Sequence, residues 1–113
     1  MRGILLFACA LLLVPFPASG FITGSDLLGW CEGSGEADVE CRFYIIGVAD
    51  AHDADAASHG FARGFCIPKE VKASQLQVVV TNWLKAHAKD LHYGAASLLL
   101  AALHQTFPCG DTN

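Results

Sequence analysis

Apolar residues recur with a helical period along most of the chain beyond residue 20. The clearest stripe begins at Leu76 and continues at offsets of 3, 4, 7 and 8 as far as Leu84, which is the spacing of one face of an α-helix. Apolar and polar residues do not alternate with a period of two over any useful length, so strands are not indicated. The pattern predicts an all-α domain, a small bundle of four or five helices.

The first two predicted helices are separated by a glycine-rich, acidic segment. The hydroxyl and carboxylate groups of Thr23–Asp26 can cap a short first helix that ends at Cys31. Residues 32–40 are expected to form a loop because of their glycines and charges. The second helix is expected from about Glu40 to about Ala57, before two glycines that would end it.

The third and fourth predicted helices carry the strongest amphipathic pattern. The third begins after Pro68 and ends around His87–Ala88. Asp90 is expected to cap the fourth, since a carboxylate is favoured at a helix N-terminus, and Pro108 ends it. The expected buried stripe of the fourth helix consists of Leu91, Ala95, Leu98, Leu99, Ala102, Leu103 and Phe107.

Residues 1–20, MRGILLFACALLLVPFPASG, have the layout of a secretory signal peptide. Arg2 precedes an apolar run from Ile4 to Val14, and small residues follow up to Gly20. The run is shorter than the ~20 residues that span a bilayer, and prolines interrupt it. We therefore expect cleavage after Gly20 rather than a membrane anchor.

Removal of the leader changes the composition that matters. The full chain has 113 residues and a formal charge of −4, and the mature segment 21–113 keeps six basic and eleven acidic residues, which gives −5. The acids concentrate in 21–65, with eight acidic and two basic residues. Such a chain is a poor ligand for nucleic acids or anionic membranes. The bias fits a basic partner or simply solubility.

The mature segment has four cysteines, an even number that in a small exported domain indicates two disulfides. Cys31 ends the first predicted helix and Cys41 begins the second, across a short loop. Cys66 precedes the third helix and Cys109 follows the fourth, so these ends meet if the two helices form an antiparallel hairpin. Among three possible pairings we therefore expect Cys31–Cys41 and Cys66–Cys109. The cysteines lack a CxxC spacing, so a zinc site is the poorer interpretation.

Residues of the kind that carry catalysis are present, but not in a catalytic pattern. The sequence has no GxSxG, HExxH or P-loop motif. The best cluster is His52, Asp53, Asp55 and His59, in which Asp55 and His59 are one helical turn apart and could share a metal ion. The simpler interpretation is a solvated connection. We therefore predict no catalytic residues, no metal and no cofactor.

Four segments stand in a fixed order along the predicted mature chain. They read FITGSDLLGWC (21–31), CRFYIIGVADA (41–51), FCIPKEVKASQLQVVVTNWLKAH (65–87) and LHYGAASLLLAALHQTFPC (91–109). Together they resemble the Rap/Tai family of small immunity proteins, which is associated with type VI secretion in Gram-negative bacteria. The most specific part is the pairing of the FCIP segment with a helix that ends in FPC.

The resemblance implies a periplasmic, disulfide-bonded inhibitor rather than an enzyme, one that often works as a homodimer. Its partner would be a peptidoglycan amidase delivered by another cell, whose substrate groove it would occlude. Exposure and charge favour two binding surfaces, the acidic connection Asp50–His59 and the turn Lys85–His92. The candidate contact residues are Asp50, Asp53, Asp55 and His59 in the first, and His87, Lys89 and His92 in the second.

Two positions depart from the family pattern. Lys72 stands where the family usually has a Thr that caps a helix together with the residue three positions on, here Gln75. Because a lysine side chain cannot accept a hydrogen bond, either Ser74 caps the third helix or that helix begins near Pro68. Ala88 stands where the family tends to have Pro, which predicts a softer break between the third and fourth helices.

Other functions remain open on the sequence alone. A short, helical, disulfide-bonded chain with five histidines and many carboxylates is also similar to the Hde-type periplasmic acid-stress chaperones. A periplasmic binding protein of the same fold without an effector is a further alternative. Saposin-like lipid binders usually carry more cysteines, and a secreted enzyme ranks last.

Overall fold

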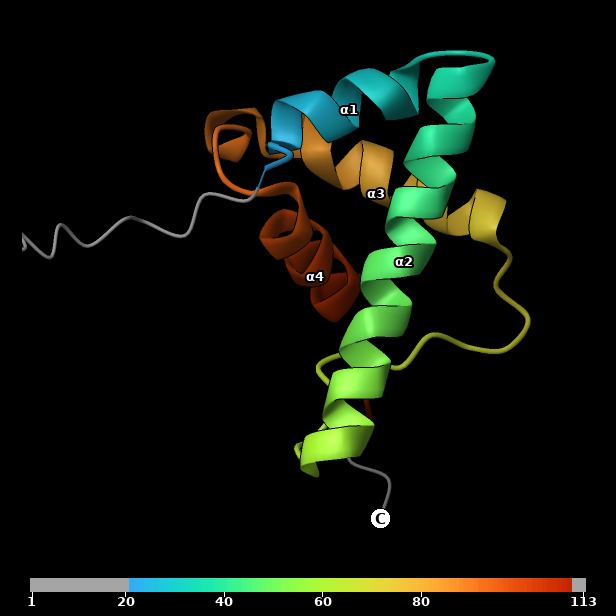
Figure 1. The fold of residues 1–113 in the computed structure, drawn as a ribbon, viewed down its shortest axis with the longest axis vertical. Coiled ribbons are helices and arrows are strands. Elements are labelled where there is room, and N and C mark those ends of the chain that lie inside the picture. Colours follow the sequence, from blue (N-terminus) through green and yellow to red (C-terminus); the bar gives the residue numbers. More distant parts are fainter. Residues whose placement is uncertain (1–20, 111–113) are drawn as a thin grey trace, which may run out of the picture.

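The computed structural model describes residues 21–110. Its elements, in chain order, are α1 (Gly24–Glu32), α2 (Glu36–His59), α3 (Ala73–Ala86), the 3-10 turn η1 (Ala88–Asp90) and α4 (Ala95–Thr106) (Figure 1). The described residues contain no strand beyond an isolated bridge between Thr23 and Gly94. The predicted all-α fold with four helices is therefore confirmed. The leader and its cleavage after Gly20 lie outside the described residues.

A reciprocal capping box starts α1, as the sequence indicates. The Thr23 hydroxyl accepts a hydrogen bond from the Asp26 backbone N–H at 3.2 Å, and the Asp26 carboxylate accepts one from the Thr23 N–H at 2.9 Å. Each bond satisfies a backbone donor that has no partner within the helix. The hydrogen bonds that Thr23 donates, first from its backbone and then from its hydroxyl, hold the pKa of Asp26 below its ordinary value of 3.8.

The connection between α1 and α2 is shorter than predicted. The expected loop over 32–40 is wrong, because only residues 33–35 lie between the helices and α2 begins at Glu36. Gly35 adopts a positive φ of 66°, a conformation that suits glycine. Glu36 and Asp38 then fall in the first turn, where the helix dipole favours acidic side chains. The same acidic residues that indicate a loop therefore start a helix.

The helix α2 continues through most of the polar stretch after Asp50. It ends at His59, two residues beyond the predicted Ala57, and Gly60 closes it in the left-handed conformation with φ of 69°. The Gly60 N–H donates to the Ala56 carbonyl at 2.9 Å. The predicted break at Gly60 is confirmed, and the predicted connection is mostly helix.

The start of α3 retains half of a capping box. The helix begins at Ala73 with Lys72 as its N-cap, so neither capping by Ser74 nor a start near Pro68 is found. The Gln75 side chain accepts a hydrogen bond from the Lys72 backbone N–H at 2.7 Å. The lysine side chain supplies no bond in return, as its chemistry requires.

The start of α4 lies four residues later than the sequence indicates. Asp90 is not its cap, because it belongs to η1, and α4 begins at Ala95 after Gly94. The carbonyls of Leu91 and Tyr93 instead accept hydrogen bonds from the first backbone N–H groups of α1, each at 2.9 Å. These contacts with α1 draw residues 91–94 out of the helix. The predicted break at His87 is confirmed.

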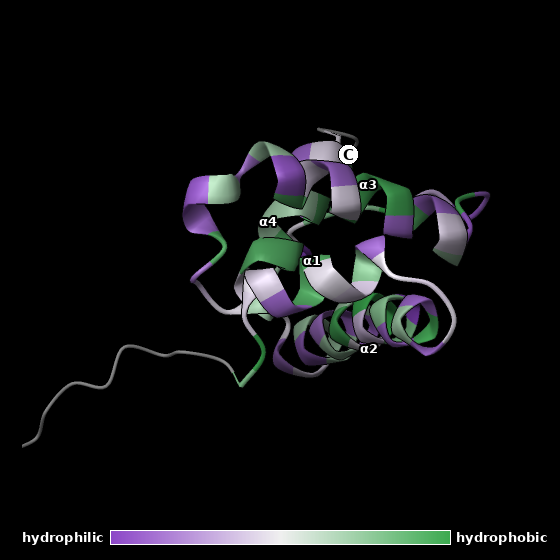
Figure 2. Ribbon diagram, turned by 90° about the horizontal axis from the view of Figure 1, so that it is seen from above, coloured by the Kyte–Doolittle hydropathy of each residue, from purple (hydrophilic) through white to green (hydrophobic). Residues whose placement is uncertain are grey.

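The long helix α2 forms one side of the molecule, and α1, α3 and α4 all lie on its other side (Figures 1 and 2). Leu27, Ile45 and Leu84 are among the largest fully buried side chains, so three helices meet at one core. The other large side chains that are fully buried are Val80, Leu99, Leu103 and Cys41. Most of the stripes expected in α3 and α4 thus face this core.

Both predicted disulfides form. The Cα atoms of Cys31 and Cys41 are 5.0 Å apart, and those of Cys66 and Cys109 are 4.9 Å apart. The second pair does not close an antiparallel hairpin of α3 and α4, because α3 runs across the molecule in a different direction from α4 (Figure 1). Cys66 instead lies in the extended segment 60–72, where its backbone N–H donates to the Phe107 carbonyl at 2.8 Å.

Candidate partner-binding surfaces

The segment Asp50–His59, predicted as an acidic connection, is the C-terminal part of α2; we refer to it as the acidic end of α2. Asp50, Asp55 and His59 are exposed there, and Asp53 is partly buried. The His59 Nδ1 lies 2.8 Å from the Asp55 Oδ1. The two side chains proposed as possible metal ligands therefore contact each other, as neighbours one helical turn apart commonly do.

The acidic end of α2 gathers residues that are distant in sequence. The Asp53 Oδ1 lies 3.8 Å from the Nε of Arg63, which belongs to the segment after α2. The ring of His52 stacks on Phe65, with centroids 5.2 Å apart, and its Nε2 is buried without a hydrogen-bond partner among the described residues. His104, at the end of α4, contacts the Gly64 carbonyl through Nδ1. No local pattern in the sequence indicates that Arg63 or His104 lies at this surface.

The second predicted surface, Lys85–His92, is the turn that joins α3 to α4. Its first candidate, His87, stacks on Trp83 with ring centroids 3.6 Å apart, and its Nδ1 lies 2.7 Å from the Trp83 carbonyl. Trp83 in turn donates through Nε1 to Gln105 of α4 at 2.8 Å. His87 thus packs the end of α3, whereas Lys89 and His92 are exposed.

The turn is held firmly against the start of α1. Gly24 is buried there, and a Cβ atom added to it would lie 3.1 Å from both the Cα and the carbonyl oxygen of Leu91. The backbone N–H of Gly24 donates a hydrogen bond to the Tyr93 carbonyl, and that of Ser25 donates one to the Leu91 carbonyl. Only a glycine at position 24 permits this close approach. Because the contact and the two hydrogen bonds hold the turn, it has a fixed position although its residues are largely exposed.

The structure does not bring the two predicted surfaces together. In Figure 1 the acidic end of α2 lies at the bottom, and the turn between α3 and α4 lies at the upper left. A partner that contacts both would have to cover the length of the molecule. The seven candidate residues thus define two separate surfaces.

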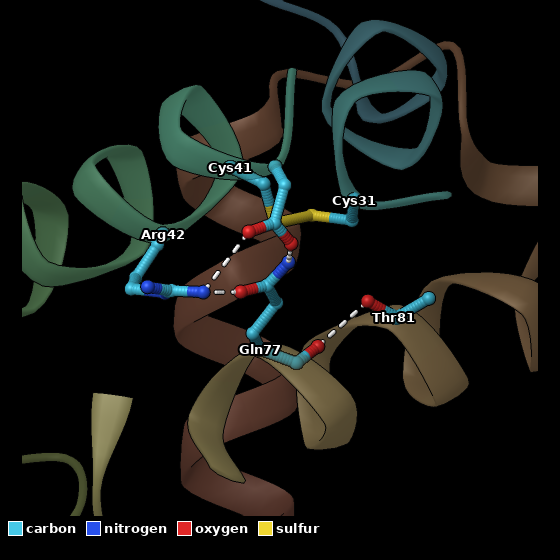
Figure 3. Close-up of a disulfide and its surroundings, with 6 residues drawn as sticks. Cys31, Cys41, Arg42, Gln77 and Thr81 are labelled. Atoms are coloured by element: carbon cyan, nitrogen blue, oxygen red, sulfur yellow. Dashed lines mark hydrogen bonds and ion pairs between the residues drawn. A yellow bond between two sulfur atoms is a disulfide. The ribbon is translucent and has the colours of Figure 1, made fainter. Parts of the chain in front are cut away.

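A polar network that sequence reasoning missed lies between α2 and α3, beside the Cys31–Cys41 disulfide (Figure 3). The Asp38 carboxylate accepts from Arg42 at 3.0 Å and from Gln77 at 2.6 Å. Arg42 also donates to Gln77 Oε1 at 3.3 Å. Gln77 is the one buried polar side chain of the described part of the chain.

This network lines an open cleft of about 360 Å³, whose walls also include Ser74, Val78, Thr81 and Asn82. The i, i+4 spacing of Asp38 and Arg42 is the only sequence signal for it. Because Asp38, Arg42 and Gln77 satisfy one another, the arrangement is best suited to joining α2 to α3.

Residues 21–110 contain no group of three or more His, Cys, Asp or Glu side chains placed to hold a metal ion. Among the same residues, no helix combines the length and the apolar character that crossing a membrane requires.

Comparison with protein families gives one match. The model of the Rap1a immunity proteins matches residues 23–109. The chain belongs to the Rap1a immunity protein family. The matched range includes all four helices and both disulfides, and it confirms the resemblance to the Rap/Tai immunity proteins. No curated protein matches the chain in sequence.

Membership in the Rap1a family makes this chain an immunity protein, a class that acts by binding an effector. Proteins of this class are generally not catalysts. The match covers the acidic end of α2 and the turn between α3 and α4 alike. Which of them contacts a partner stays a prediction.

Proposed function

We propose that this chain is a periplasmic immunity protein that binds and inhibits a peptidoglycan amidase delivered by type VI secretion. The observation that carries the proposal is the Rap1a family match, which extends over the whole helical domain from residue 23 to residue 109. The predicted leader and the two disulfides support an exported protein, since disulfides persist in oxidising compartments.

The fold suits inhibition by occlusion. An inhibitor that is already rigid loses less conformational entropy on binding, and both disulfides hold the helices in place. The turn between α3 and α4 is a candidate to enter a substrate groove, because it is exposed but fixed by hydrogen bonds to α1. An amidase blocked in this way would keep its catalytic residues and lose access to peptidoglycan.

The first experiment identifies the partner. The tagged full-length chain is exported and oxidised in a bacterium that carries a type VI secretion system, and bound proteins are recovered. We expect a peptidoglycan amidase, and we expect periplasmic production of that amidase to lyse cells unless this chain is co-expressed with its leader. A version without residues 1–20 should give no protection.

The outcomes separate the functions that the sequence leaves open. Recovery of many unrelated periplasmic proteins, together with suppression of client aggregation near pH 3, would favour an acid-stress chaperone and contradict the proposal. Recovery of no amidase would also contradict it and favour a binding protein without an effector. The mass of the complex would test the predicted homodimer.

A further inference from the structure

One face of α2 points away from the other three helices. Residues 36, 39, 40, 43, 47 and 50 follow the spacing of a single helical face, and we call this set the outer face of α2. Figure 2 shows α1, α3 and α4 all on the opposite side of this helix. The outer face therefore has no partner within the described chain.

The centre of the outer face is apolar. Phe43 is 69% exposed and Val39, one turn earlier, is 46% exposed. An aromatic ring that is 69% exposed gains little from burial within the chain. Exposed aromatic side chains of this kind often supply much of the binding energy at protein interfaces.

Gly47 lies one turn after Phe43 on the same face. A glycine in the interior of a helix destabilises that helix relative to alanine. A Cβ atom at Gly47 would meet no atom within 4 Å, so packing within the chain gives no reason for the glycine. Absence of a side chain there leaves the helix backbone open to close approach from outside.

Three acidic residues, Glu36, Glu40 and Asp50, flank this apolar centre, and all three are exposed. The ion pairs of residues 21–110 engage Asp38, Asp53 and Asp55 but none of these three. The helix dipole accounts for Glu36 in the first turn. It does not account for Glu40 and Asp50, because its effect fades beyond that turn.

The charges decide between two kinds of occupant. A second copy that paired through this face would bring the acids of one protomer towards those of the other, and like charges repel. A basic partner surface would gain from the same arrangement. We propose that the outer face of α2 docks a basic protein surface with an apolar pocket for Phe43 and a backbone segment that passes close to Gly47. The proposal rests on the proposed function, because that surface belongs to the amidase.

The test measures binding of the recovered amidase to the exported, oxidised protein and its variants. Phe43→Ala should weaken binding at least tenfold and Val39→Ala about threefold, as expected for a central aromatic and its neighbour. Glu40→Lys should weaken binding about tenfold, mainly through slower association, and the loss should shrink as salt screens the charges.

Two matched controls carry the same substitutions elsewhere. Val78→Ala changes an exposed valine on α3, which is 59% exposed, and Glu70→Lys reverses an exposed charge in the segment 60–72. Both variants should bind within about twofold of the unmodified protein, the usual range for side chains outside the centre of an interface.

Gly47→Ala separates binding from folding. The substitution should raise the melting temperature by about 4 °C, since alanine favours the helix. It should nevertheless weaken binding to the amidase about tenfold, because the added methyl group blocks the close approach. A poorly folded variant could not give this combination.

The docking surface, its occupant and the proposed function would each be contradicted by a different result. Unchanged binding for Phe43→Ala, Glu40→Lys and Gly47→Ala, with the amidase still inhibited, would overturn the docking surface and leave the proposed function standing. A dimer that dissociates on Phe43→Ala would assign the face to a second copy and contradict the proposal. Failure to find any inhibited amidase would overturn both.

Discussion

The two disulfides, Cys31–Cys41 and Cys66–Cys109, lie in different surroundings. Cys31–Cys41 joins residues 10 apart and lies in the hydrophobic core, where Cys41 is fully buried. Cys66–Cys109 joins residues 43 apart, and both of its cysteines are exposed. The first bridge is surrounded by packed helices, whereas in the segment 60–72 only Phe65 is buried.

This difference indicates which part of the fold each disulfide stabilises. Near Cys31 the core and the polar network of Asp38, Arg42 and Gln77 also hold the helices together. Near Cys66 the extended segment has few buried groups to hold it, so the covalent bond replaces packing. We infer that loss of the second bridge opens one end of the molecule, and loss of the first weakens the core.

The largest effect is expected from removing the exposed bridge. The double substitution Cys66→Ala/Cys109→Ala should lower the free energy of unfolding by about 4 kcal/mol, because the bridge closes a long loop in the unfolded chain. That is a large part of the ~5–10 kcal/mol typical of a domain this size. Denaturant unfolding measures the loss, and trypsin should cleave faster after Arg63 and Lys69. Unchanged cleavage at those sites would contradict local opening.

Removing the buried bridge by Cys31→Ala/Cys41→Ala should lower the free energy of unfolding slightly less. It should also leave the segment 60–72 closed. The shorter loop closed by Cys31–Cys41 gives about 3 kcal/mol in the same chain-entropy estimate. Denaturant unfolding should detect this loss, whereas cleavage after Arg63 under native conditions should stay close to that of the unmodified protein. Faster cleavage at Arg63 in this variant would show that the two ends are not independent.

A smaller effect is expected from the polar network beside the first bridge. Gln77→Ala leaves Asp38 and Arg42 without one partner each, which should lower the free energy of unfolding by about 1 kcal/mol. The loss is modest because both charged side chains are partly exposed and water can replace the amide. Asn82→Ala, which removes an exposed amide of the same helix that makes no side-chain hydrogen bond within residues 21–110, serves as the control. A loss of stability for Gln77→Ala no larger than that of the control would show that the network does not stabilise the fold.

The smallest effect concerns acid and the start of α1. The hydrogen bonds from Thr23 lower the pKa of Asp26 in the folded protein. The stability they add is present above the ordinary value of 3.8 and is lost as the pH falls through the lower folded pKa. Asp26→Asn should reduce the stability difference between pH 6 and pH 2. An identical pH dependence in the variant would contradict this role.

Local signals in the sequence were sufficient where contacts are local. The stripe from Leu76 to Leu84 and the Thr23 cap depend on neighbours within one or two helical turns, and both are confirmed. The disulfide pairing followed from the order of the helices, although the predicted hairpin geometry behind the second pair was wrong. The starts of α2 and α4 were also wrong.

Contacts between distant residues explain what the sequence could not show. Asp90 reads as a helix cap, but the carbonyls of Leu91 and Tyr93 bind α1 and delay the helix. His104 and Gly64 meet across 40 residues, so no local pattern reveals that α4 contributes to the acidic end of α2. The exposed position of Phe43 likewise depends on where the other three helices lie.

An inhibition titration tests directly whether this chain blocks a peptidoglycan amidase. Peptide release from purified peptidoglycan by the recovered amidase is followed while the oxidised protein is added in increasing amounts. We expect amidase activity to fall linearly to near zero at a fixed stoichiometry, as for a tight inhibitor that occludes the substrate groove. Full amidase activity in the presence of excess folded protein would contradict this expectation.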